Sequence, residues 1–123
     1  MNKLDIRGHG CSNVLILHGW GQNTTLSWER FMRLCKNDKQ FKWMFLKLPG
    51  LDFKLERPLD TKDYAQYVID TLQRAKIKPD FILAHSFGCQ ITTHILAHNF
   101  LKPSKVMYLG AAGLPYQLTL FER

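Results

Sequence analysis

Four short apolar segments constrain the fold of this chain more than any other feature of its sequence. The first, NVLIL, is apolar and β-branched after its asparagine, which is typical of a strand buried on both faces of a parallel sheet. The others follow at intervals of about 25 to 40 residues, the length that a strand, a crossover helix and a returning strand require. The predicted strands are residues 13–17, 42–48, 81–84 and 105–109.

The segments between these strands change to helical periodicity. Residues 28–35 and 64–72 each place apolar side chains along one face of a helix. Asp60 precedes the second of these segments at an N-cap position, where its carboxylate can accept free backbone N–H groups. A third helix is expected at about residues 87–100, and residues 51–59 are predicted to form an irregular loop.

This alternation of strands and helices defines the expected fold class. A short extra strand is expected near Leu4–Arg7, ahead of the four main strands. Right-handed crossovers then give an α/β fold of three layers, an open and mostly parallel sheet with helices on both faces. At 123 residues the chain can build no more than one core, so we expect a single domain.

Composition excludes several classes of protein. With 46% hydrophobic and 22% charged residues, the chain is neither disordered nor a coiled coil. The net charge of +7 is spread along the sequence among acidic residues, which predicts a solvated basic surface and no nucleic-acid partner. The three cysteines have no C-x-x-C spacing, so we expect neither disulfides nor a metal site. The absence of a long apolar stretch predicts a cytoplasmic protein with no membrane partner.

Two glycine-containing motifs follow predicted strands, and ligands of open parallel sheets bind at the carboxyl ends of strands. HGWG follows the first strand, and AHSFG places Ser86 between a strand and a helix with small residues two positions away on either side. A sharp turn there gives the serine a strained conformation with an exposed hydroxyl. Ser86 is therefore a candidate nucleophile, and the N–H of Phe87 can face a developing negative charge.

With these motifs the chain resembles the α/β-hydrolase family. The resemblance rests on HGWG, the LPG turn after the next strand and the HSFG elbow after the third, and it covers nearly all of the chain. It implies that Ser86 is the nucleophile and that the backbone N–H groups of Trp20 and Phe87 form the oxyanion hole. It also implies acyl transfer to water from a small ester-like substrate, with no cofactor.

Supporting roles follow from the same resemblance. His18 orients the oxyanion loop, which also contains Gly19 and Gly21, and Gly88 packs the helix against the sheet. His85 is expected to pack under the turn, where it does not act as a base. The family's elbow usually has glycine where this chain has Ala84, and often another where it has Cys89, which is interpreted as a small buried packing residue.

The triad acid and histidine of the family are not found after Ser86. His94 and His98 lie eight and twelve residues along the same predicted helix, about 12 and 18 Å from the serine, and are interpreted as ordinary helix residues. We therefore expect residues 1–123 to be the N-terminal part of one hydrolase domain with little or no activity alone. Lys105–Leu109 would then form an open sheet edge through which the chain self-associates.

Two other functions remain open from the sequence. Gly19, Gly21 and Thr24 partly match a dinucleotide-binding fingerprint, although a threonine stands in place of its third glycine and no ribose-binding acid follows the second strand. The other is a non-catalytic scaffold that keeps the fold of an enzyme for binding or oligomerisation. A downstream aspartate and histidine in a longer gene would favour the enzyme over the scaffold.

Overall fold

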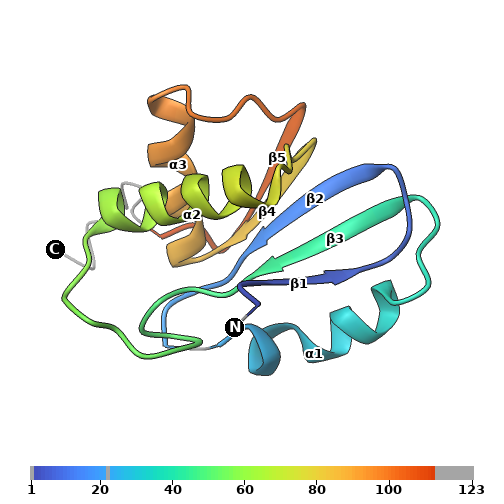
Figure 1. Cartoon of the computed structure of the whole chain (residues 1–123), viewed down its shortest axis with the longest axis horizontal. Helices are drawn as coiled ribbons and strands as arrows, with labels where there is room; N and C mark the ends of the chain where they lie inside the picture. Colours follow the sequence, from blue (N-terminus) through green and yellow to red (C-terminus); the bar gives the residue numbers. More distant parts are fainter. Residues whose placement is uncertain (1, 22, 113–123) are drawn as a thin grey trace, which may run out of the picture.

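The computed structural model describes residues 2–21 and 23–112 and contains the expected alternation of strands and helices (Figure 1). The extra strand near the N-terminus is present as β1. The strands are β1 (Leu4–Arg7), β2 (Ser12–Leu17), β3 (Phe41–Leu46), β4 (Phe81–His85) and β5 (Lys105–Leu109). The helices are α1 (Thr24–Cys35), α2 (Thr61–Ala75) and α3 (Phe87–Ala97).

The five strands form one sheet in the order β1-β3-β2-β4-β5. All neighbouring pairs are parallel except β1 with β3, which confirms the mostly parallel sheet expected from the sequence. β2 lies at the centre of this sheet, with β3 on one side and β4 on the other. The carboxyl ends of β2 and β4 therefore lie next to each other, and both glycine-containing motifs begin there.

Helices cover both faces of the sheet, as expected. Successive side chains of β2 point to opposite faces: Leu15 and Leu17 belong to the core beneath α2 and α3, whereas Val14 and Ile16 belong to the core beneath α1. All four are almost completely buried, which explains why this strand is apolar throughout instead of alternating. The layers are visible in Figure 1, with α1 on one side of the sheet and α2 and α3 on the other.

Local interactions account for three of the element boundaries. Asp60 caps α2 as predicted. Its side chain accepts a hydrogen bond from the backbone N–H of Asp63, and the side chain of Asp63 accepts one from the backbone N–H of Asp60, which together form a capping box. The helix predicted to continue to about residue 100 ends at Ala97, because Asn99 adopts a left-handed conformation with φ of 55°. β3 ends at Leu46, two residues earlier than predicted, and the backbone N–H of Leu48 donates to the side chain of Asp52.

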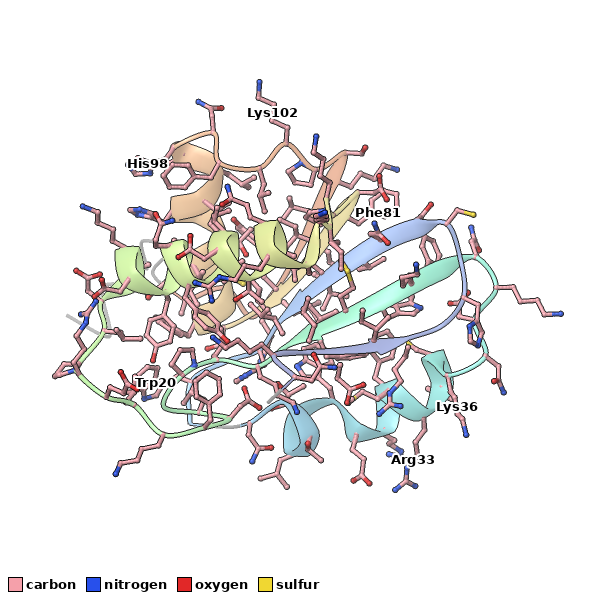
Figure 2. All side chains as sticks on the ribbon, viewed as in Figure 1. Trp20, Arg33, Lys36, Phe81, His98 and Lys102 are labelled. Carbon is pink, nitrogen blue, oxygen red and sulfur yellow. The ribbon has the colours of Figure 1, made fainter. Side chains whose placement is uncertain are left out.

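β5 is an open edge in the part of the chain that the structure describes, since it pairs only with β4. Met107 is 58% exposed, and Tyr108 and Leu109 are also exposed. On the α1 side, a hollow of about 390 Å³ runs over β4 and β5 and is lined mainly by apolar side chains, Phe81 and Met107 among them. Figure 2 shows Phe81 at the end of the sheet away from Trp20.

Candidate active site

The turn between β4 and α3 gives Ser86 an unusual backbone conformation. Its φ of 49° and ψ of −114° lie in a region that side-chain-bearing residues rarely occupy, and such strain collects at functional sites. Backbone hydrogen bonds hold the residue on both sides. Its N–H donates to the carbonyl of Leu109 at 3.0 Å, and its carbonyl accepts from the N–H of Cys89 at 3.0 Å and of Ala112 at 3.3 Å. Neighbouring structure therefore maintains the strained conformation.

The residues two positions from Ser86 lie in closely packed surroundings. Ala84 is fully buried in the core. A Cβ atom added to Gly88 would lie 2.4 Å from the carbonyl oxygen of Leu17, in the backbone of β2. The start of α3 thus lies directly against the central strand, and this close approach fixes the angle at which the chain leaves the turn.

The HGWG loop lies against the Ser86 turn. A Cβ atom added to Gly19 would be 3.1 Å from the Cβ of Ser86 and 3.0 Å from Nδ1 of His85. The rings of Trp20 and Phe87 meet edge to face with centroids 5.2 Å apart. Two motifs separated by more than sixty residues in the sequence are therefore in direct contact.

Two backbone N–H groups lie at this contact. Within residues 2–21 and 23–112, the N–H groups of Trp20 and Phe87 have no acceptor in the protein. Phe87 is the first residue of α3, so its N–H also lies at the positive end of the helix dipole. Two such donors beside a serine hydroxyl can stabilise the oxyanion that forms when the hydroxyl attacks an acyl carbon.

His18 of the HGWG loop is buried, and both of its ring nitrogens have a hydrogen-bond partner. Its Nδ1 lies 2.9 Å from the carbonyl oxygen of Gly19, and its Nε2 lies 2.7 Å from Oδ2 of Asp52. Asp52 also accepts hydrogen bonds from the backbone N–H groups of Leu48 and Thr24. Burial alone would raise the pKa of the Asp52 carboxyl, but these hydrogen bonds outweigh it and the pKa is lowered.

Sequence reasoning missed Asp52, which lies in the segment predicted to be an irregular loop. That segment contains no helix or strand, only an isolated bridge between Pro49 and Phe53. Its contacts join the start of α1, the end of β3 and the HGWG loop. No local pattern reveals contacts of this kind, since the partners of Asp52 include residues 28 and 34 positions away.

The other histidines form no hydrogen bond with the Ser86 hydroxyl in the part of the chain that the structure describes. His85 is half-buried, with its ring between Gly19 and Gly110 beside the turn. His94 and His98 stack on each other on α3, with ring centroids 4.2 Å apart. In the described residues no general base is within hydrogen-bonding distance of Ser86.

Neither buried cysteine is suited to act as a nucleophile. Cys89 donates its thiol to the carbonyl of Ala84 at 3.2 Å, and burial raises its pKa. Burial and the nearby charge of Asp38 raise the pKa of Cys35 to about 11. Both thiols therefore stay protonated near neutral pH, so Ser86 is the stronger candidate.

A hollow of about 450 Å³ opens beside Trp20. Its walls are mostly apolar, from Trp20, Tyr64 and the loop before α2, with Glu56 and Arg57 also lining it. Figure 2 shows the Trp20 side chain near this loop, and the ring is 63% exposed. An apolar group of a ligand could occupy this hollow, which Trp20 of the HGWG loop lines.

The described residues include no group of three or more histidine, cysteine or acidic side chains that could hold an ion. No helix among them is both long and apolar enough to cross a bilayer.

The start of α1, where a dinucleotide phosphate would bind, is occupied by the Asp52 carboxylate, which accepts a hydrogen bond from the N–H of Thr24 at 2.6 Å. A phosphate would be repelled there, which disfavours dinucleotide binding.

Comparison with known proteins identifies the fold. No protein-family model matches the chain, and no curated protein matches it. Solved structures do match. An α/β-hydrolase fold protein from Burkholderia ambifaria superposes with a TM-score of 0.75 at 17% identity, over 96% of this chain and 43% of that one. Cfl2 from Burkholderia cenocepacia gives a TM-score of 0.76 at 22% identity, over 95% and 42%.

An esterase from Exiguobacterium antarcticum gives a TM-score of 0.69 at 21% identity, over 89% of this chain and 41% of that one. The chain therefore has the α/β-hydrolase fold, as the resemblance in its motifs implied. It spans less than half the length of each of these structures.

Proposed function

We propose that this chain carries the nucleophile and the oxyanion hole of a serine hydrolase that acts on small ester-like substrates. The observation that carries the proposal is the Ser86 turn, in which a strained serine lies beside two N–H groups that have no acceptor among residues 2–21 and 23–112. In this reaction Oγ of Ser86 forms a bond to the acyl carbon, and the carbonyl oxygen becomes an oxyanion held by the N–H groups of Trp20 and Phe87. The alcohol then leaves, and water releases the acid.

In the proposed reaction, a general base outside the described residues removes the serine proton. The chain spans 41–43% of the three structures compared, and we propose that it forms part of one hydrolase domain. Without a base beside Ser86, attack is slow but still assisted by the oxyanion hole. The similarity to an esterase and the apolar hollow beside Trp20 both favour an ester with an apolar acyl or alcohol group.

Fluorophosphonate labelling tests the role of Ser86. We expect slow formation of a covalent adduct, which mass spectrometry of peptides should place on Ser86. Ser86→Ala should abolish this adduct, whereas Ser104→Ala, which removes an exposed serine outside the turn, should leave it unchanged. Equal labelling of several serines, or none at Ser86 in the folded chain, would contradict the proposed nucleophile and favour the non-catalytic scaffold. Rapid ester turnover would show that a base is present after all.

We also propose that the chain self-associates through β5. The unpaired backbone groups of this edge can bond to the same edge of a second copy, and the exposed side chains of Met107 and Leu109 add apolar area. Size-exclusion chromatography at micromolar concentration should therefore show dimers or larger species. Met107→Lys should shift them toward monomer, while Leu34→Lys, on an exposed α1 site, should not. A stable monomer of the unmodified chain would refute this prediction.

A further inference from the structure

The carboxylate of Asp52 is almost fully removed from solvent, with its side chain 5% exposed, yet every nearby bond favours its charged form. Oδ1 accepts from the N–H of Thr24 at 2.6 Å. Oδ2 accepts from the N–H of Leu48 at 2.7 Å and faces Nε2 of His18 at 2.7 Å. A buried carboxylate with this number of donors is stable as an anion, and its position is fixed from three parts of the chain.

The bonding of His18 indicates its charge. Nε2 faces the Asp52 carboxylate, and Nδ1 faces the carbonyl oxygen of Gly19 at 2.9 Å. A charged Asp52 carboxylate and the Gly19 carbonyl are both acceptors, so both ring nitrogens donate when Asp52 is an anion. Only the imidazolium form has a proton on each nitrogen. With Asp52 charged, this bonding pairs its carboxylate with an imidazolium, and the His18 side chain is only 1% exposed.

This pair acts on the peptide unit that links Gly19 to Trp20. The peptide is trans, so its carbonyl and its N–H point in opposite directions. The carbonyl of Gly19 is bonded to the His18 ring, so the N–H of Trp20 must point away from that ring. Ser86 also lies close to Gly19, since a Cβ atom on the glycine would be 3.1 Å from the Cβ of Ser86.

We propose that Asp52 is a positioning residue, which acts through a protonated His18 to hold the N–H of Trp20 in the orientation that an oxyanion requires. Asp52 keeps the imidazole charged, and the second proton of the ring fixes the Gly19 carbonyl. The benefit to the reaction rests on the proposed function, while the ion pair and the orientation of the peptide do not. Removing the charge of Asp52 should therefore release this peptide without touching Ser86.

Nuclear magnetic resonance of Asp52→Asn tests the proposal, with Asp38→Asn as the matched control. Asp38 also accepts several hydrogen bonds, from the N–H groups of Gln40 and Phe41 and from the indole of Trp43, but it lies outside the site. In the unmodified chain near neutral pH, we expect the ¹⁵N signals of His18 to show protons on both ring nitrogens. Asp52→Asn should remove one of them and shift the Trp20 amide signal, and Asp38→Asn should do neither.

The rate of Ser86 labelling by a fluorophosphonate provides the functional measurement. We expect Asp52→Asn to lower this rate by about 10-fold or more, with no change in Asp38→Asn. A His18 ring with one unprotonated nitrogen in the unmodified chain would overturn the proposal, even if Asp52→Asn failed to fold. An unshifted Trp20 amide in folded Asp52→Asn would overturn it as well. If Ser86 does not label but the ring and amide signals behave as expected, the proposed function fails and the ion pair stands.

Discussion

Gly88→Ala is expected to lower the free energy of unfolding by about 3 kcal/mol, although alanine is the better helix former. Helix propensity alone would predict a gain of about 1 kcal/mol at this position in α3. The added Cβ, however, would lie 2.4 Å from the carbonyl oxygen of Leu17 and 3.0 Å from that of His18. Both are backbone atoms at the end of the central strand, so α3 must move away from the sheet. The steric cost exceeds the gain in propensity.

Urea denaturation followed by circular dichroism measures this loss. Gly21→Ala is the matched control, because its Cβ would meet nothing within 4 Å but its φ of 76° is unfavourable for alanine. We expect that variant to lose about 1 kcal/mol from strain alone. Gly88→Ala should also slow Ser86 labelling, since the turn moves with the helix. An unchanged or raised stability for Gly88→Ala would show that the turn is not packed as tightly as the structure indicates.

The layered fold could be predicted from the sequence because its main signals are local. A strand covered on both faces needs apolar residues at every position, and residues 14–17 have them for that reason. The helical spacing of apolar residues in the segments between the strands predicts the crossover helices. The turn at Ser86 was recognisable too, since the need for small residues on both sides is a property of adjacent positions. Ser86 was accordingly expected to adopt the strained conformation that the structure shows.

Other features leave no periodic pattern in the sequence and could not be predicted in this way. Asp52 lies in a loop without periodicity, and only the folded chain brings it to His18 and to the start of α1. The early end of α3 depends on the left-handed conformation of Asn99, which no periodicity indicated. Likewise, β3 ends early where the N–H of Leu48 donates to Asp52.

Tyr64→Ala is expected to lower the free energy of unfolding by about 4 kcal/mol and to disturb the site. The Tyr64 side chain is 1% exposed, and its ring meets the rings of Phe87 and Trp20 at centroid distances of 5.3 and 6.5 Å. Its hydroxyl donates to the carbonyl of Pro49 at 2.8 Å. Removing the ring leaves a cavity where α2, the turn and the HGWG loop meet. Tyr64→Phe should lose only about 1 kcal/mol, the value of the one hydrogen bond.

Tyr67→Ala is the control that separates a loss of stability from a change in the geometry around Ser86. Tyr67 lies on the same helix, and its hydroxyl donates to the carbonyl of Lys47 at 2.9 Å, but its ring packs against Phe53 and not against Trp20. Tyr67→Ala should therefore destabilise the chain without shifting the indole N–H signal of Trp20, whereas Tyr64→Ala should shift it. If both variants left that signal unchanged, Trp20 would be held by the HGWG loop alone. The aromatic contacts would then contribute to stability but not to the geometry around Ser86.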